Sequence, residues 1–189
     1  MKENKYDDNI FFQKYSQMSR SQQGLAGAGE WETLRKLLPD FKDKRVLDLG
    51  CGYGWHCIYA MEHGASSVVG VDISHKMLEV AKEKTHFPQV EYKCCAIEDV
   101  EFPEESFDVI LSSLAFHYVA DYEILVKKIY RILKSGGKLV FTVEHPVFTA
   151  YGTQDWYYNE KGEILHFPVD NYYYEGKRTA VFLGEKVTK

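Results

Sequence analysis

Short apolar runs alternate with longer amphipathic stretches through the middle of the chain. Five runs have the length and the apolar character of buried strands, and they cover Arg45–Leu49, Ser67–Val71, Val90–Cys94, Phe107–Ser112 and Lys138–Val143. The stretches between them place apolar residues at helical spacing over 54–63, 74–84 and 122–133. Strands that alternate with helices in this way predict an α/β fold, in which a doubly wound, parallel sheet carries helices on both faces.

The two ends of the chain do not follow this alternation. Residues 1–24 are polar with interspersed aromatic side chains and predict short helices, and an apolar stripe predicts a helix over 25–38 that Pro39 ends. The last part is rich in aromatic residues and contains one further predicted strand, Arg178–Leu183. We expect a single domain over 1–189 with three parts: a helical lid over 1–40, the α/β core over 41–145 and an aromatic-rich segment over 146–189.

Composition narrows the class of protein. The chain has 189 residues, 45% of them hydrophobic, and its 28 acidic and 23 basic residues give a net charge of −5. Without a run of Lys or Arg, a nucleic-acid partner is disfavoured. No apolar run approaches a membrane span, and the N-terminus leads into no signal segment, so we expect a cytoplasmic protein. The cysteines lack the spacing of metal ligands and predict reduced thiols without a metal site: Cys51, Cys57, Cys94 and Cys95.

The most informative motif follows the first predicted strand. It reads D-x-G-x-G-x-G from Asp48 to Gly54, and the next predicted strand ends on Asp72, 24 residues after Asp48. Glycines let a backbone turn sharply and approach a ligand closely. A carboxylate at the end of the neighbouring strand can accept hydrogen bonds from both hydroxyls of a ribose. Asp48 and the open glycine loop suit an amino-acid group that carries an ammonium.

A dinucleotide site is the rival interpretation of this loop. Its fingerprint, G-x-G-x-x-G, admits a pyrophosphate to a helix N-terminus. Here Trp55 stands three residues after Gly52, where that fingerprint has a glycine. An NAD-dependent oxidoreductase is therefore disfavoured, although the glycine spacing alone leaves it open.

With this loop and the acidic end of the second strand, four later segments match a known family in order along the chain: Ile97–Asp99, Phe107–Tyr118, Leu133–Gly137 and Thr142–Pro146. From about Tyr6 to Tyr174 the chain resembles class I S-adenosylmethionine-dependent methyltransferases of the methyltransferase domain 11 group. The resemblance implies a Rossmann-like fold, S-adenosylmethionine as cofactor and S-adenosylhomocysteine as product.

The resemblance also implies a set of cofactor-binding residues. The methionine part would lie beside Asp48, Gly50, Cys51, Gly52 and Gly54, and the ribose would bind Asp72. The adenine would contact Ile73, Met77, Ala96, Ile97 and Glu98. The sulfur that carries the methyl group would lie near Ser112 and Ser113. Tyr15 and Arg20 would belong to the lid, with Arg20 pairing with the cofactor carboxylate. The alternative for these two is a solvated surface segment.

The chain departs from the family pattern in two places. Many relatives carry an acidic side chain at the position of Ala96, which cannot contact the adenine amino group in that way. The group usually ends with a helix and an antiparallel hairpin beside the fifth strand, but only Arg178–Leu183 remains here for that part. The C-terminal strands are therefore expected to be incomplete, either because the chain is truncated after Lys189, which we favour, or because the sheet edge itself is incomplete.

Methyl transfer is a direct displacement that needs positioning more than a covalent intermediate. His117, just past the fourth strand, is the candidate general base, and its alternative role is packing. Glu144 is the candidate for orienting the acceptor, against a purely structural turn fixed by Pro146. For the tyrosines of 151–174 three roles stay open. They could line a substrate pocket, cover the sheet, or bind a second subunit in a homodimer.

We therefore expect a methyltransferase that acts on an unidentified small molecule. The sequence has neither a Pro-Cys pair for pyrimidine methylation nor the Asn/Asp-Pro-Pro-Tyr/Phe motif of amine and glutamine methyltransferases. A non-catalytic S-adenosylmethionine-binding protein stays open as well, because its cofactor motifs would be the same.

Overall fold

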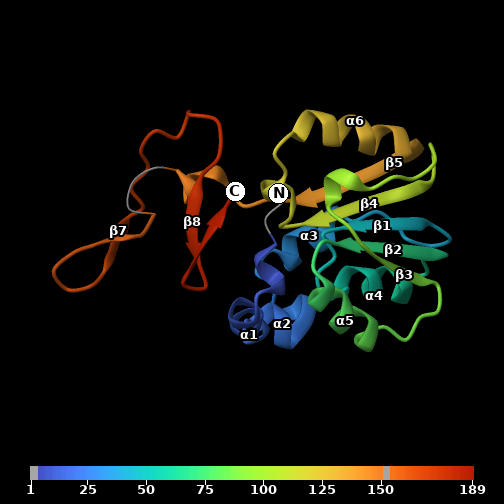
Figure 1. The fold of residues 1–189 in the computed structure, drawn as a ribbon, viewed down its shortest axis with the longest axis horizontal. Coiled ribbons are helices and arrows are strands. Elements are labelled where there is room, and N and C mark those ends of the chain that lie inside the picture. Colours follow the sequence, from blue (N-terminus) through green and yellow to red (C-terminus); the bar gives the residue numbers. More distant parts are fainter. Residues whose placement is uncertain (1–3, 151–153) are drawn as a thin grey trace. The chain divides into compact units, whose positions relative to one another are not determined.

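The computed structural model describes residues 4–150 and 154–189 (Figure 1). Tyr151, the first of the tyrosines considered above, lies outside the described residues. Contacts between residues divide the chain into two compact units, one over 1–143 and the other over 144–189.

The first unit contains a five-stranded sheet. Its strands are β1 (Arg45–Leu49), β2 (Ser67–Asp72), β3 (Val90–Cys94), β4 (Phe107–Ser113) and β5 (Leu133–Thr142). They pair in the order β3-β2-β1-β4-β5, and every pairing is parallel. This order confirms the predicted Rossmann-like sheet. It also brings the carboxyl ends of β1, β2 and β4 side by side, where doubly wound sheets bind their ligands.

Helices cover both faces of this sheet, as predicted. Figure 1 shows α6 (Tyr122–Ile132) on one face and α4 (Trp55–Glu62) and α5 (His75–Lys84) on the other. Successive strand residues alternate between the two faces. Leu47 therefore belongs to the core that contains Ile129 of α6, and its neighbour Val46 belongs to the core that contains Ala60 of α4.

The helix starts follow from local capping. The Ser74 hydroxyl accepts the backbone N–H of Met77 at 3.2 Å and so caps the start of α5. The Asp121 carboxylate accepts the N–H of Ile124 at 2.9 Å and caps α6 in the same manner. Both caps follow the carboxyl end of a strand, so they fix where the chain turns back along the sheet.

The predicted single helix over 25–38 is wrong. The chain instead forms a 3₁₀ turn, η2 (Gly24–Gly27), and a separate helix, α3 (Trp31–Leu37), with extended backbone at Ala28 between them. Gly27 explains the break, because a Cβ at this position would lie 2.3 Å from the backbone oxygen of Ser19. The close packing of two backbones therefore outweighs the apolar stripe. The preceding elements are η1 (Lys5–Asp7), α1 (Asn9–Ser16) and α2 (Ser19–Gln23).

The start of β5 also differs from the prediction. The strand begins at Leu133, which pairs with Phe107, rather than at Lys138 after a turn. Gly136 has a φ of 76°, and the register shifts before Val109 pairs with Lys138. The pair Gly136-Gly137, which reads as a turn before Lys138 in the sequence, is therefore an irregularity inside a longer strand. Two short 3₁₀ turns, η3 (Ile97–Asp99) and η4 (Phe116–Tyr118), follow β3 and β4.

The second unit consists of η5 (Pro146–Thr149) and two antiparallel hairpins. One pairs β6 (Tyr157–Tyr158) with β7 (Ile164–His166), and the other pairs β8 (Thr179–Phe182) with β9 (Glu185–Thr188). The predicted strand Arg178–Leu183 is confirmed as β8, whereas β9 was not predicted. Each hairpin is a separate two-stranded sheet.

Candidate functional site

The glycine loop turns sharply after β1. Gly50, Gly52 and Gly54 all have positive φ angles, of 80°, 52° and 75°. The backbone N–H groups of Gly50 and Cys51 both donate to the carbonyl of Val71, at 2.8 and 2.9 Å. The loop is therefore fastened to the end of β2, and the sharp turn expected of the glycines is present.

Two of these glycines serve different purposes. A Cβ at Gly50 would lie 2.4 Å from the Cβ of Ala115, so the loop packs directly against the segment after β4. A Cβ at Gly52 would have no heavy atom within 4 Å. Gly50 is therefore required by packing, whereas the backbone at Gly52 borders open space that a ligand can occupy.

Asp72 lies at the end of β2 and holds the glycine loop. Its Oδ2 accepts the N–H of Gly52 at 2.8 Å, and its Oδ1 accepts the N–H of Ser74 at 2.9 Å. Desolvation by the surrounding protein raises the pKa of Asp72 to about 6, although both hydrogen bonds act in the opposite direction. Each carboxylate oxygen has a second lone pair, which can accept a hydroxyl of a ribose.

Asp48 lies deeper, at 1% exposure. Its Oδ2 accepts the thiol of Cys57 at 3.5 Å, whereas its Oδ1 has no hydrogen-bond partner within the part of the chain that the structure describes. Burial, with a smaller effect from the Asp72 charge, raises the pKa of Asp48 to about 7. An unpartnered buried carboxyl oxygen is costly and therefore rare. An ammonium group would satisfy it, so this site fits the amino-acid part of S-adenosylmethionine.

Among the residues proposed for the adenine, Ile97 lies at the same loop. The Cδ1 of Ile97 lies 3.5 Å from the Cβ position at Gly50, so this side chain contacts the glycine loop. Ala96 is buried and precedes η3, and the backbone carbonyl of Glu98 accepts the ammonium of Lys128 at 2.7 Å. Met77 is buried at 2% exposure in α5.

The ends of the central strands are joined by hydroxyl groups. Ser112 is buried, and its hydroxyl donates to the carbonyl of Leu49 at 2.7 Å, linking β4 to β1. The hydroxyl of Ser113 donates to Glu30 Oε1 at 3.0 Å and lies 3.2 Å from the hydroxyl of Thr142. Ser113 therefore connects the ends of β4 and β5 to a carboxylate from outside the sheet.

Residues 4–27, which we call the N-terminal strap, connect both sides of the site. On one side Asp7 accepts the Ser74 hydroxyl at 2.6 Å and the N–H of Lys76 at 3.1 Å, at the start of α5. The Asn4 amide also donates to the carbonyl of Ile73 at 3.2 Å. On the other side the hydroxyls of Tyr6 and Tyr118 lie 3.3 Å apart.

Tyr15 of the strap lies near several charged groups. Its ring meets those of Tyr6 and Tyr53 edge to face, at centroid distances of 5.3 and 5.8 Å. Burial raises the pKa of Tyr15; the Arg20 charge opposes this, and the charges of Asp72 and Glu30 add to it. The Tyr15 phenol is therefore within electrostatic reach of both the ribose-binding candidate and the Arg20–Glu30 pair.

The two predicted catalytic residues are in different units. His117 lies in η4, directly after β4, with its ring 4.4 Å from that of Tyr118. Glu144 lies in the second unit, where its carboxylate pairs with the ammonium of Lys189. The first unit thus contains His117 and all the cofactor candidates, whereas Glu144 has its described ion pair within the other unit.

Sequence reasoning missed Glu30. It stands directly before α3, so its position is that of a helix cap, but its side chain makes no cap hydrogen bond. It pairs instead with Arg20 at 2.7 Å and accepts from Ser113. A carboxylate after two glycines and before an apolar stripe is too common to single out, so only the fold shows this contact.

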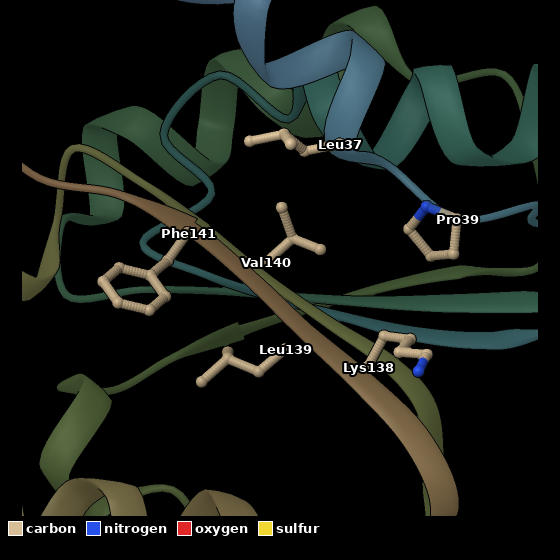
Figure 2. Close-up of a pocket in the computed structure, with 6 residues that line it drawn as sticks. All are labelled: Leu37, Pro39, Lys138, Leu139, Val140 and Phe141. Carbon is tan, nitrogen blue, oxygen red and sulfur yellow. The ribbon is translucent and has the colours of Figure 1, made fainter.

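A separate groove of about 560 Å³ runs along β5 (Figure 2). Figure 2 shows Leu37 and Pro39 on one side of it and Val140 facing them from the strand. The groove is lined by Leu37, Pro39, Lys138, Leu139, Val140 and Phe141, none of which is a cofactor candidate. Among the helices of residues 4–150 and 154–189, none has both the length and the apolar character needed to cross a membrane.

Comparison with known proteins assigns the family. The family described as "Methyltransferase domain" matches residues 47–141, half of the chain. A Haemophilus influenzae protein without an assigned activity is 37% identical over 186 residues, which are 92% of this chain and 71% of that protein.

Two crystal structures are similar in sequence and in fold. One, from Listeria monocytogenes, is assigned to the S-adenosylmethionine-dependent methyltransferases. It is 57% identical to this chain with a TM-score of 0.79, and the match covers 85% of this chain and 76% of the Listeria chain. The other, an S-adenosylmethionine-dependent methyltransferase from Mesorhizobium loti, is 41% identical with a TM-score of 0.75, over 82% and 70%. Together with the glycine loop and the two aspartates, these matches show that the chain belongs to the methyltransferase domain family and is an S-adenosylmethionine-dependent methyltransferase.

Proposed function

We propose that this enzyme transfers the methyl group to a small-molecule acceptor by direct in-line displacement. When bound, S-adenosylmethionine supplies a methyl group on a positively charged sulfur. The observation that carries the proposal is the pair Asp48 and Asp72 at the ends of adjacent strands, of which Asp48 has an unpartnered buried oxygen. Such a pair suits a ligand with both an ammonium and a ribose.

The cofactor roles follow the chemistry of each side chain. Asp48 would bind the ammonium, Asp72 the ribose hydroxyls and Arg20 the carboxylate. Ile73 and Met77 would flank the adenine, and residues 96–98 would lie along its edge. Cys51 supports the loop with its backbone N–H, which donates to Val71, and with its thiol, which donates to the carbonyl of Gly52 at 4.0 Å.

The acceptor would lie at the carboxyl ends of β4 and β5. Ser113 and Thr142 present hydroxyl groups there, and His117 follows in η4. Holding the acceptor in line with the methyl group supplies most of the rate. His117 would accept a proton only from an acceptor that must lose one, and Glu144 remains our candidate for orienting an amine or a hydroxyl.

A small molecule is favoured as the acceptor by charge. The net charge of −5 offers no general attraction to a polyanion such as nucleic acid. The carboxylates of Asp48, Asp72 and Glu30 around the site would also repel a phosphate backbone.

The test is calorimetric titration of the chain with S-adenosylhomocysteine, with NAD as the control ligand. We expect micromolar binding of the nucleoside and none of NAD, and a loss of at least about tenfold in affinity in Asp72→Ala. In acceptor screens with methyl-labelled cofactor, His117→Ala should lower turnover and leave this binding unchanged. Binding of NAD in place of the homocysteine nucleoside would refute the proposal.

A further inference from the structure

Glu30 is shared between a cation and a hydroxyl at the edge of the site. Its Oε1 accepts the Arg20 guanidinium at 2.7 Å and the Ser113 hydroxyl at 3.0 Å. The two charged side chains are only 23% and 21% exposed, so water screens their attraction weakly. Burial alone would raise the pKa of Glu30, but the Arg20 charge and the hydrogen bonds outweigh it and lower the pKa below its ordinary value. Glu30 is therefore a carboxylate anion bound to Arg20.

This ion pair lies beside the cofactor residues. The Arg20 and Glu30 charges both act on Tyr15, whose pKa is also affected by Asp72. Both charges also act on the buried ring of His56, which follows the glycine loop in α4. Ser113, the third member, ends β4 next to β1. The pair is thus hydrogen-bonded to the carboxyl end of β4 and shares with Asp72 an electrostatic effect on Tyr15.

A guanidinium binds a carboxylate best when two N–H groups point at it together. In the structure Glu30 already takes one nitrogen of Arg20, Nη2. A second carboxylate on the same guanidinium must therefore share it with Glu30, and the two anions repel one another. The positive charge of Arg20 is thus partly neutralised by Glu30 before the carboxylate of an amino-acid ligand binds.

We propose that Glu30 is a resident counter-ion of Arg20 that competes with the cofactor carboxylate and so lowers the affinity of the site for the amino-acid part of its ligand. This inference rests on the proposed function, in which Arg20 binds that carboxylate. Glu30 is a positioning residue in this role: it acts through Arg20. When the cofactor carboxylate is bound, Glu30 keeps its hydrogen bond from Ser113 and stays at the acceptor side of the site.

The experiment compares two probes that differ in the amino-acid part. S-adenosylhomocysteine carries the carboxylate, and 5′-methylthioadenosine keeps the nucleoside but lacks it. Both are titrated calorimetrically into the wild type and Glu30→Gln, which keeps the amide oxygen for Ser113 and removes the charge. We expect Glu30→Gln to bind S-adenosylhomocysteine about twofold to fivefold more tightly, the upper part of the range for a partly exposed ion pair, and 5′-methylthioadenosine with unchanged affinity.

Glu32→Gln is the matched control. Glu32 lies two residues further along and pairs with Arg35 at 2.9 Å, but its side chain is 72% exposed. Its substitution should change neither affinity. The increase in affinity for S-adenosylhomocysteine in Glu30→Gln should also become smaller as salt is added, because salt screens the attraction between Arg20 and Glu30 that the substitution removes.

Three results for Glu30→Gln would overturn the inference. Unchanged binding of S-adenosylhomocysteine would mean that Glu30 does not compete. Weaker binding of both probes would make Glu30 a structural support, and weaker binding of S-adenosylhomocysteine alone would make it a direct ligand of the ammonium. The proposed function fails separately: a wild type that binds both probes equally would remove Arg20 from the cofactor site.

Discussion

At the scale of single residues, Asp48 carries a carboxyl group that the fold shields almost completely from water, at 1% exposure. Its carboxyl ionises near 3.8 in an unfolded chain, whereas burial raises the pKa to about 7 in the fold. Between these values the folded state binds more protons than the unfolded state. The contribution of this carboxyl to the free energy of unfolding is therefore fully present below pH 3.8 and lost as the pH rises through about 7.

We therefore predict that Asp48→Asn is more resistant to urea than the wild type at pH 8, because the substitution removes a buried charge. The difference in free energy of unfolding between the two proteins should become smaller as the pH falls to 5, where the wild-type carboxyl is protonated. Urea unfolding of both proteins at several pH values measures it. A difference that stays constant with pH would show that Asp48 is ionised at all of them. Asp72, with a pKa of about 6, titrates in both proteins, and its charge adds a smaller effect on Asp48.

The role of a side chain was predictable from the sequence where a local motif determines it. Asp72 and Ser74 follow from the end of an apolar strand and from capping rules, and their observed hydrogen bonds agree with both. Glu30 was not predictable, because its partner Ser113 is 83 residues away in the chain. Such contacts depend on the order of strands and not on any local pattern.

At the scale of elements, the strap depends on Asp7. This carboxylate accepts hydrogen bonds from the Ser74 hydroxyl and from backbone N–H groups at the start of α5, and these bonds hold its pKa below the ordinary value although burial opposes them. Asp7 therefore adds a second, distant cap to a helix that Ser74 already caps.

We predict that Asp7→Asn loosens the strap without unfolding the sheet. Losing the charge should weaken the cap by roughly 1 kcal/mol, which corresponds to about fivefold faster tryptic cleavage after Lys14 and Arg20. Mass spectrometry of timed digests measures the rates. Asp40→Asn is the control, because Asp40 also accepts a backbone N–H, from Lys42 at 3.0 Å, but in the loop before β1. Equal cleavage rates in both variants would contradict the role of Asp7.

Elements were predictable where periodicity and packing agree. The strands of the sheet and the helices that cover it follow from their apolar patterns, and the start of α5 follows from Ser74. The helix over 25–38 failed because Gly27 packs against the backbone at Ser19, a contact that no periodicity encodes. The early start of β5 was hidden by Gly136 and Gly137, which normally indicate a turn.

At the scale of the whole molecule, the two units differ in how they are stabilised. The first has two apolar cores, one on each face of its sheet. In the described part of the second, the buried side chains are small and few: Thr149, Ala150, Ala180 and Val187. In β6 and β7 every residue is exposed. Hairpins with so little buried surface are only marginally stable.

We predict a matching order of amide hydrogen exchange. Amides of β1 should exchange most slowly, those of β8 and β9 faster, and those of β6 and β7 fastest, because local opening follows buried contacts. Exchange followed by mass spectrometry or NMR checks the order. Uniform protection across both units would contradict it.

The parallel sheet was predictable because its central strands β1, β2 and β4 are buried on both faces and therefore read as continuous apolar runs. The second unit was not, since its strands are short and exposed and its aromatic residues give no clear period. The groove along β5 was likewise beyond prediction, because it needs both α3 and the outer strand in place.

The contacts of the strap have a consequence for the exchange of one nucleoside for the next. The strap is bonded to Ile73 and Lys76 after β2, and its Tyr6 meets Tyr118 after β4. For a nucleoside bound beside Asp72, as proposed above, we expect release to require these contacts to open. Their opening rate would then be a ceiling on the number of catalytic cycles per second, and a faster relative would need a looser strap before it needed better chemistry.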